Sequence, residues 1–278
     1  MQTISIMGSG LMGSSLGLAL RKRGVPVRIH VYARRAEIRK TALNLGIADA
    51  VFSDPAEAVK GADLVVFCVP VLTIPELAKA CHAGLQPGAI LTDVGSTKAR
   101  LNELMAEVLA GTGVEFIGSH PICGSEQQGI EAGNADLYDG AVTVVTPPPR
   151  VNETSVKKVS NLWKSAGSTV TVMDAVKHDC ILAATSHLPH VVAAALALSA
   201  GDNGMFCGSG FRDTTRIADG SPQVWSDIVR TNAPALKTAL KNFCENLNEL
   251  AELVEEADGE KLTNWFTAAR DKRKELLG

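Results

Sequence analysis

The chain has 278 residues, of which 46% are hydrophobic and 21% charged, as is typical of a globular protein with one large domain or two ordinary ones. The formal net charge is −3 and no block of lysines or arginines occurs, so we expect neither nucleic acid nor an anionic membrane surface as a partner. No charged leader precedes an apolar core and no run of about 18 apolar residues occurs, which indicates a cytoplasmic protein without a membrane span. Six cysteines without a CxxC pair indicate reduced, mostly buried thiols.

Strand-like and helix-like segments alternate over residues 1–173. The apolar or β-rich runs that predict strands lie at 2–7, 27–32, 63–69, 89–93, 114–117, 141–146 and 169–173. Apolar residues at helical spacing predict helices at 11–23, 36–45, 97–110 and 156–165. This alternation is typical of the α/β class, so we predict a Rossmann-type domain with a doubly wound parallel sheet over residues 1–173.

The pattern changes after residue 173. Segments 174–200, 222–253 and 259–277 are helical in pattern, and no strand is evident among them. We therefore predict that residues 174–278 form a second, all-helical domain.

Three glycines between the first predicted strand and helix form a GxGxxG pattern. Gly8 permits a tight turn, Gly10 lets the backbone approach a pyrophosphate, and Gly13 lets the helix pack closely on the sheet. The helix N-terminus also offers free N–H groups and a partial positive charge to phosphates. This context favours dinucleotide binding over the alternative, a glycine-rich turn that binds nothing. The residues assigned to the cofactor here are Gly8, Ser9, Gly10, Leu11, Met12, Gly13, Val69 and Pro70.

The end of the second predicted strand bears on the choice between NAD and NADP. NAD sites usually place Asp or Glu about 20 residues past the last glycine, where this chain has Ala33 followed by Arg34 and Arg35. A missing carboxylate removes repulsion toward a 2′-phosphate, which a guanidinium can clamp. We predict NADP as cofactor, with NAD as the weaker alternative, and assign both Arg34 and Arg35 to it, with Arg34 as the main phosphate ligand. The competing interpretation is that two exposed arginines merely begin a helix and that Glu37 pairs with one of them.

Two polar residues follow neighbouring predicted strands. Ser96, in the segment DVGSTK, is expected at a helix N-cap that faces the crevice beyond the strand ends, although capping alone would explain it. His120 follows the strand 114–117 and should reach the same crevice. A position beside Ser96 favours a general base held by a hydroxyl over an ordinary surface histidine.

The helical half of the chain contributes further polar residues. His187 and His190, in the segment SHLPH, share a helix face. No cysteine or carboxylate stands at a convincing ligand spacing, so we expect no metal. The glycine-rich segment 208–217 carries Arg212 and Arg216 and is expected to be a carboxylate-binding loop between helices, unless its arginines pair with nearby carboxylates.

In order along the chain, GxGxxG, DVGSTK, GSHPICGSE, SHLPH and FRDTTRIADGSPQVW resemble the prephenate/arogenate (cyclohexadienyl) dehydrogenases of tyrosine biosynthesis. The resemblance runs from Ile4 to the helices after Trp225, and the combined set of motifs is specific. It implies an oxidative decarboxylation, in which the cofactor takes hydride from the ring carbon bearing the 4-hydroxyl of a cyclohexadiene. The ring carboxylate then leaves as carbon dioxide as the ring becomes aromatic. The resemblance also implies a homodimer formed through the helical domain.

The same resemblance implies roles for individual residues. His120 would accept the 4-hydroxyl proton, and Ser96 would hydrogen-bond the same hydroxyl or orient His120. Arg216 would bind the ring carboxylate as an ion pair. His190 would contact the substrate, and His187 would support it. These roles agree with chemistry, because a base needs a pKa near neutrality and a buried carboxylate needs a bidentate partner.

The resemblance says least about the residues near the substrate's side chain. Glu126 matches a family glutamate near the cleft mouth, and Trp225 matches an aromatic near the active site. Gln127 and Gln128 stand where many members have lysine or other residues, and Cys123 stands where a small alanine is common. We assign Gln127 to the substrate, leave arogenate and prephenate both open, and favour arogenate slightly because NADP is expected.

Two rival functions remain at this point. A β-hydroxyacid dehydrogenase of the same shape would need a lysine on the long interdomain helix, and Lys177 is the only lysine near the start of that segment. A non-catalytic NADP-binding sensor would keep the glycines and arginines, but it would have no reason to keep Ser96, His120 and Arg216 together.

Overall fold

The computed structural model describes residues 2–124 and 127–278. Contacts between Cα atoms divide the chain into two compact bodies, Met1–Asn232 and Ala233–Gly278. The predicted division into domains 1–173 and 174–278 stays a prediction.

The strands of the first body are short and come mostly from its N-terminal part. They are β1 (Thr3–Met7), β2 (Arg28–Tyr32), β3 (Ala50–Phe52), β4 (Leu64–Phe67), β5 (Ile90–Asp93), β6 (Glu115–Phe116), β7 (Gly118–Pro121), β8 (Val142–Thr146) and β9 (Thr169–Val172). Its α-helices are α1 (Leu11–Lys22), α2 (Ala36–Asn44), α3 (Pro55–Val59), α4 (Ile74–Cys81), α5 (Ala99–Val108), α6 (Glu153–Ala166), α7 (Ala175–Leu182), α8 (Leu188–Ser199), α9 (Ser209–Thr215) and α10 (Pro222–Thr231).

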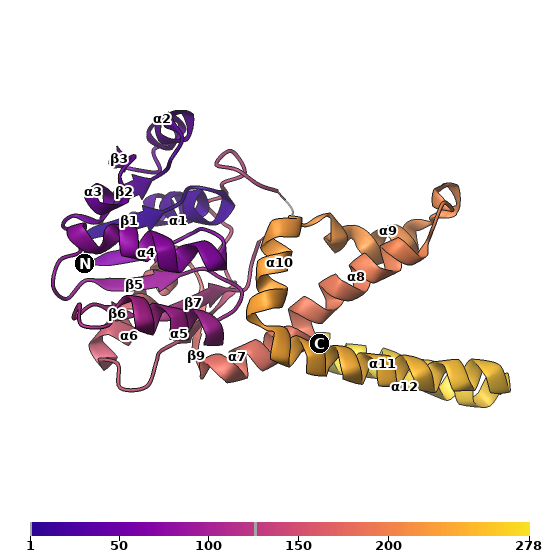
Figure 1. The fold of residues 1–278 in the computed structure, drawn as a ribbon. Coiled ribbons are helices and arrows are strands. Elements are labelled where there is room, and N and C mark those ends of the chain that lie inside the picture. The colour runs from indigo at the N-terminus through magenta and orange to yellow at the C-terminus, as the bar shows by residue number, and fades with distance from the viewer. Residues whose placement is uncertain (1, 125–126) are drawn as a thin grey trace. The chain divides into compact units, whose positions relative to one another are not determined.

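The main sheet has six strands in the order β3-β2-β1-β4-β5-β6, and all of their pairings are parallel. The chain runs outward in one direction from β1 to β3 and then returns to continue on the other side with β4. This reversal is the switch point at which doubly wound folds bind dinucleotides, outside the carboxyl ends of the strands. The predicted α/β fold with a Rossmann-type parallel sheet is confirmed (Figure 1).

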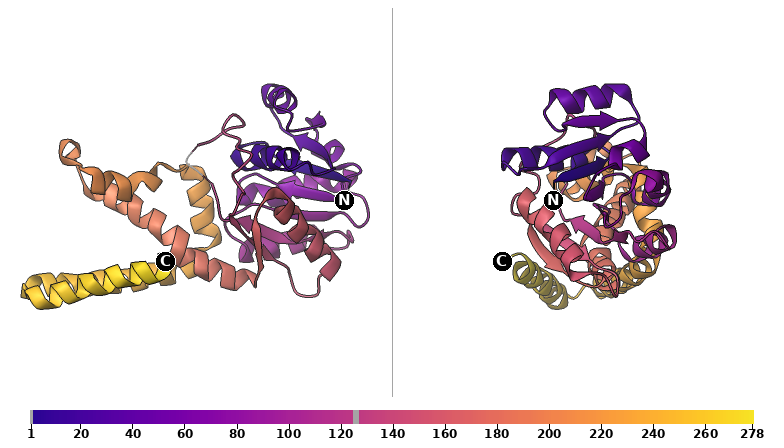
Figure 2. Two further views of the ribbon diagram at one scale, coloured as in Figure 1. Left: turned by 180° about the vertical axis from the view of Figure 1, so that it is seen from behind. Right: turned by 90° about the vertical axis from the view of Figure 1, so that its left-hand side faces the viewer.

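Helices cover both faces of this sheet, which explains why its strands are continuous apolar runs. Along β4, Leu64 and Val66 face a core that includes residues of α1 and α6. Val65 and Phe67 face the opposite core, which includes residues of α4 and α5. Figures 1 and 2 show α4 on one side of the sheet and α1 on the other.

A second sheet of three strands, in the order β7-β8-β9, departs from the prediction of one parallel sheet. The predicted strands 141–146 and 169–173 belong to it, and β7 pairs antiparallel with β8. Strand β7 was not predicted, because its sequence Gly-Ser-His-Pro combines glycine and proline, which are unusual inside strands. His120 therefore lies within a strand, opposite Val144, and not in a loop after one.

The predicted single helix 174–200 is interrupted. A π-helical turn, Ala183–His187, separates α7 from α8. Proline at position 189 has no N–H for an α-helical bond and would clash with the carbonyl four residues earlier, so the wider turn accommodates it. By length and composition Ala175–Ser199 could also cross a membrane. However, four of its polar side chains are buried against protein: His178, Asp179, His187 and His190.

The predicted helix 222–253 is also two helices, α10 and α11 (Ala233–Glu256), with a break at Asn232. Proline at position 234 is typical of a first helical turn. The expected loop 208–217 is mostly helical, since α9 continues into a 3₁₀ turn, Arg216–Asp219. In the second body, α11 packs side by side with α12 (Gly259–Leu277), as Figure 2 shows.

The cysteines are all free thiols, as predicted, but they are not mostly buried. Only Cys81 is buried, whereas Cys180 and Cys244 are exposed and the other three are half-buried. The two exposed cysteines lie in helices α7 and α11 on faces open to solvent, which apolar composition alone does not reveal.

A fully buried ion pair joins the end of β5 to the start of α5. The Lys98 ammonium contacts the Asp93 carboxylate, and both side chains are 0% exposed. The pair also holds β7, because Lys98 Nζ donates to the Ser119 carbonyl at 2.9 Å and the Ser119 N–H donates to Asp93 Oδ1 at 3.0 Å. Burial works against both charges, raising the pKa of Asp93 and lowering that of Lys98, and each partner opposes the shift of the other. The network fixes the loop with Ser96 and the strand with His120 to one framework.

Replacing Lys98 with methionine tests this framework. Lys98→Met leaves a buried carboxylate without its cation, which is expected to lower the free energy of unfolding by about 3–5 kcal/mol in a urea titration. The matched control is Lys60→Met, which breaks an exposed pair with Glu57 and should cost under about 1 kcal/mol. Equal unfolding midpoints for the two variants would contradict the framework.

Candidate active site

The glycine-rich turn between β1 and α1 is built as a phosphate cradle. Gly8 has a φ of +110°, and a Cβ there would stand 2.7 Å from the Cys68 carbonyl oxygen. A Cβ on Gly13 would stand 2.0 Å from the Gly8 carbonyl oxygen. A Cβ on Gly10, in contrast, would meet nothing within 4 Å. Packing therefore explains Gly8 and Gly13, whereas the space beside Gly10 is open for a ligand.

Donors without protein partners surround this turn. Helix α1 begins after Gly10 with no side-chain cap, so its first N–H groups point outward from the helix end. Ser9 Oγ is buried and has no hydrogen-bond partner among the described residues. Tyr138 Oη donates to the Met12 carbonyl at 2.7 Å and fixes the first turn of α1 from the other side. This arrangement suits an anion such as a pyrophosphate.

A first cavity of about 570 Å³ opens at this turn. Its lining includes Ala33, Arg34 and Arg35, at the end of β2, where the sequence predicted a site for a 2′-phosphate. The lining residues are Gly8, Ser9, Gly10, Tyr32, Ala33, Arg34, Arg35, Ile38, Cys68, Val69, Pro70, Gly129 and Ile130.

The two arginines at this cavity differ in their partners. Arg35 Nε lies 3.5 Å from Glu37 Oε1. Arg34 makes no side-chain hydrogen bond or ion pair with any residue that the structure describes. Arg39, which the sequence analysis missed, donates to the carbonyls of Ala33 and Arg34 at 2.8 and 2.7 Å and so fixes the loop. The guanidinium of Arg34 is the one left available to a ligand.

A second cavity of about 430 Å³ shares a wall with the first. Both are lined by Gly10, Cys68, Val69, Pro70 and Gly129. The second cavity continues past Leu11 and Met12 to Ser96, Gln127 and Trp225. One elongated ligand could therefore run from the arginines, across the glycine turn, to the segment around Trp225.

Ser96 lines the second cavity but does not cap a helix. Helix α5 has Lys98 at its N-cap and begins at Ala99. Its first N–H groups are satisfied from another helix, because Asp179 Oδ1 accepts from Lys98 N at 2.8 Å and Oδ2 accepts from Ala99 N at 2.9 Å. The predicted N-cap role of Ser96 is wrong, since a distant carboxylate replaces a local cap.

His120 is buried and oriented by another histidine. The residue is 7% exposed and lines neither cavity, and its Nδ1 lies 2.9 Å from His178 Nε2. Ser96, which was expected to stand beside it and hold it, makes no hydrogen bond with His120. Burial is the largest cause that lowers the pKa of His120 well below its ordinary value. The ring is therefore neutral at pH 7 and can accept a proton.

The two histidines of the SHLPH segment meet one tryptophan. The ring of His190 stacks on Trp225 with centroids 3.4 Å apart, and the ring of His187 lies edge-on to it at 6.2 Å. Burial lowers the pKa of His187 to about 4 and also lowers that of His190. Gly220 makes this packing possible, because a Cβ there would stand 2.6 Å from Trp225 Nε1.

The remaining predicted site residues do not share one location. Gln127 lines the second cavity, whereas Arg216 lies at the start of the 3₁₀ turn after α9 and is exposed. Glu126 lies outside the described residues.

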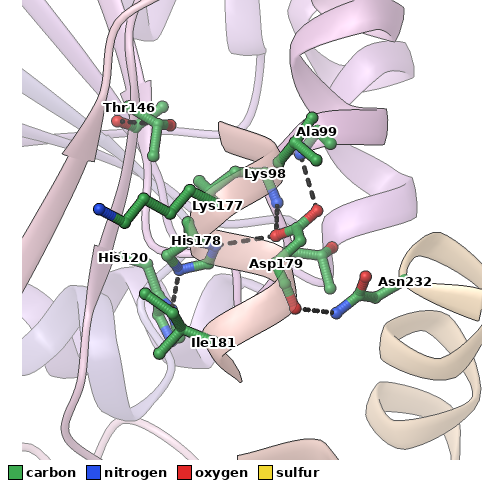
Figure 3. Close-up of polar contacts among 12 residues, drawn as sticks. Lys98, Ala99, His120, Thr146, Lys177, His178, Asp179, Ile181 and Asn232 are labelled. Atoms are coloured by element: carbon green, nitrogen blue, oxygen red, sulfur yellow. Dashed lines mark hydrogen bonds and ion pairs between the residues drawn. The ribbon is translucent and has the colours of Figure 1, made fainter. Parts of the chain in front are cut away.

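A chain of contacts, missed by the sequence analysis, links His120 to Trp225. His178 contacts Asp179, whose carbonyl accepts from Asn232 Nδ2 at 2.8 Å. The same amide nitrogen lies 3.1 Å from His187 Nδ1. Figure 3 shows His120, His178, Asp179 and Asn232 in this order. Adjacent His and Asp on a helix carry no periodic signal, although Asn before Ala-Pro marks a helix boundary.

Comparison with known proteins agrees with this geometry. Residues 16–172 match "Prephenate dehydrogenase, nucleotide-binding domain", and residues 174–268 match "Prephenate dehydrogenase, dimerization domain". A cyclohexadienyl dehydrogenase of Zymomonas mobilis is 32% identical over 284 residues, which cover 97% of this chain and 94% of that relative.

Solved structures give the same result. Prephenate dehydrogenase from Aquifex aeolicus, in complex with hydroxyphenyl propionate and NAD+, has a TM-score of 0.92 and 32% identity, covering 99% of this chain and 98% of that chain. Synechocystis arogenate dehydrogenase has a TM-score of 0.84 and 27% identity, covering 99% of this chain and all of the other (100%). This chain therefore belongs to the prephenate dehydrogenase family, the enzymes with prephenate or cyclohexadienyl dehydrogenase activity in tyrosine biosynthesis.

Proposed function

We propose that this protein catalyses the NADP-dependent oxidative decarboxylation of arogenate, prephenate or both. The observation that carries the proposal is the pair of adjoining cavities, with Arg34 at one end and Ser96 and Trp225 at the other. A buried neutral histidine, His120, is tied to Trp225 by a continuous chain of contacts.

The cofactor fits the residues present. Ser9 Oγ lacks a protein partner, the space beside Gly10 is open, and the uncapped start of α1 supplies N–H donors. We assign the pyrophosphate to Gly8, Ser9, Gly10, Leu11, Met12 and Gly13, and the shared wall of the cavities to Val69 and Pro70. When bound, the nicotinamide would accept hydride from the ring carbon that bears the substrate's 4-hydroxyl.

NADP is proposed over NAD because no carboxylate stands at the end of β2. Ala33 occupies that position, and the Arg34 guanidinium is unpaired among the described residues while Arg35 faces Glu37. A 2′-phosphate would gain a charge-assisted contact from Arg34. NAD remains the alternative, since the Aquifex relative was solved with NAD+.

The chain's own residues would handle the substrate. His120 would accept the 4-hydroxyl proton, and Ser96 would hydrogen-bond the same hydroxyl from the cavity wall. Arg216 would pair with the ring carboxylate, which leaves as carbon dioxide while its bonding electrons make the ring aromatic. His190, His187, Trp225, Gln127 and Glu126 are proposed to contact or support the substrate.

We propose a homodimer, as the dimerization-domain match suggests. Apolar side chains are unusually exposed in the helical part of the chain: Leu198 at 86%, Met205 at 87% and Phe206 at 78%. Patches of this kind mark interaction sites. A cytoplasmic location is part of the same proposal.

Two alternative functions would need different residues. A β-hydroxyacid dehydrogenase would need a lysine beside its substrate, but Lys177 is exposed and points away from the buried face that carries His178 and Asp179 (Figure 3). A non-catalytic NADP sensor would not need a buried, oriented base. The first alternative predicts that His120 is dispensable for turnover, and the second predicts no turnover at all.

Replacing His120 tests the proposed function. His120→Asn should lower kcat by about 10²–10⁴-fold, because the 4-hydroxyl proton loses its acceptor. NADP binding, measured by titration, should persist. The control is His82→Asn, since His82 lies in the 3₁₀ turn after α4, outside the contacts that join His120, His178 and Asp179. Turnover of His120→Asn at the parent rate would contradict the mechanism.

Replacing Arg34 tests the cofactor preference. Arg34→Ala should raise the KM for NADP by about 10-fold or more and leave the KM for NAD nearly unchanged, as expected for loss of one charge-assisted contact. Arg35→Ala, which removes the arginine that faces Glu37, should have the smaller effect. An equal rise in both KM values for Arg34→Ala would reject the phosphate clamp.

The pH profile of kcat/KM tests the state of the base. Burial lowers the pKa of His120, so the ring gains its proton only when the pH falls well below the ordinary histidine value of 6.5. Activity should be full above that pH and should decline on an acid limb that lies below it. An acid limb centred at or above pH 6.5 would contradict this account.

A further inference from the structure

We propose that His178 and Asp179 form a relay that fixes the tautomer of His120, so that its Nε2 carries the lone pair that takes the substrate's proton. This inference rests on the proposed function and adds two positioning residues to it. Neither residue lines either cavity, and His178 contacts the Nδ1 side of His120, so both would act only through His120.

The relay starts at an acceptor whose role is unambiguous. Asp179 Oδ1 accepts from the backbone N–H of Lys98, and Oδ2 accepts from that of Ala99. Backbone N–H groups can only donate, so the carboxylate is held with its lone pairs toward α5. The partial positive charge at the start of α5 stabilises this anion. Figure 3 shows the carboxylate between α5 and the ring of His178.

The carboxylate then orients the ring of His178. His178 Nδ1 lies 2.8 Å from Asp179 Oδ1, so Nδ1 carries the proton and donates it. The side chain of His178 is 0% exposed, so it is shielded from bulk solvent. With this ring neutral, its other nitrogen, Nε2, is an acceptor.

The tautomer of His120 follows from that acceptor. His120 Nδ1 lies 2.9 Å from His178 Nε2, so Nδ1 of His120 carries the proton. Its own Nε2 is left bare, and this nitrogen has no hydrogen-bond partner among the described residues. The ring is thus set to accept a proton at Nε2, and the imidazolium that forms is stabilised through His178. The opposite tautomer would present an N–H to the hydroxyl and could not act as base.

Two variants of His178 separate this role from packing. The amide of glutamine reaches the position of His178 Nε2 and can accept from His120, whereas that of asparagine reaches only the position of Nδ1. His178→Asn should lower kcat by about 10- to 100-fold, with both KM values within about 3-fold of the parent. His178→Gln should recover most of kcat. Equal losses in the two variants would overturn the proposal.

A double mutant distinguishes failure of the relay from failure of the proposed function. If His178 acts only through His120, adding His178→Asn to His120→Asn should change kcat by less than about 2-fold. The same loss in both backgrounds would overturn the relay. If His120→Asn alone retains the parent kcat, the proposed function fails first.

A spectroscopic measurement tests the relay in the parent protein itself, and variants serve only to assign the signals. In the parent protein labelled with ¹⁵N-histidine, the ring signals of His120 and His178 should both show protonated Nδ1 and bare Nε2 near pH 7. Assignment uses the loss of one signal set in His120→Asn and one in His178→Gln. A protonated Nε2 on neutral His120 would overturn the relay.

Discussion

The buried ion pair between Asp93 and Lys98 is the constraint on which the site depends. A pair with no exposure is costly to desolvate and holds its place only when its remaining hydrogen-bonding capacity is met. Here Ser119 meets part of it from both sides, accepting from Lys98 and donating to Asp93. Because Ser119 precedes His120 and Lys98 follows the loop of Ser96, one ionic contact positions both motifs.

A second carboxylate, that of Asp179 in helix α7, also joins separate elements of the fold. It closes the start of α5 in place of a local cap and holds His178 at the same time. The end of β5, the start of α5, strand β7 and helix α7 therefore share one polar network. Trp163 Nε1 extends it by donating to Ser119 Oγ at 2.9 Å. Such a buried network, in which these polar groups bond to one another, specifies one arrangement of the strand that carries the base.

The sequence predicted the features that depend on local pattern. Continuous apolar runs identified the parallel strands, because strands buried on both faces need no polar alternation. The glycine spacing identified the turn at which the two cavities meet. The family, too, followed from motifs that are contiguous in sequence. The assigned roles of Ser96, His120 and Arg216 stay predictions, as does the boundary at residue 173.

Features that depend on tertiary contact escaped prediction. Strand β7 is made by pairing with β8 and by the ion pair, not by the propensity of Gly-Ser-His-Pro. In the sequence, Ser96 has the position of a helix cap. In the structure, Asp179, 80 residues from Ala99, accepts the hydrogen bond from the N–H of Ala99 instead. His178 and Asp179 look like ordinary helical residues, since nothing local shows that α7 turns them inward while Lys177 faces solvent. The expected long helix is interrupted by a π turn, because Pro189 lacks the N–H that an α-helical bond needs.

The most direct test of the account is the initial rate of NADPH formation with arogenate and with prephenate, each repeated with NAD. The account predicts turnover with at least one of the two substrates and a higher kcat/KM with NADP than with NAD. Turnover on prephenate alone would retain the mechanism and reject only the preference for arogenate. No turnover on either substrate, with NADP still bound, would contradict the account and favour the hydroxyacid dehydrogenase or the sensor.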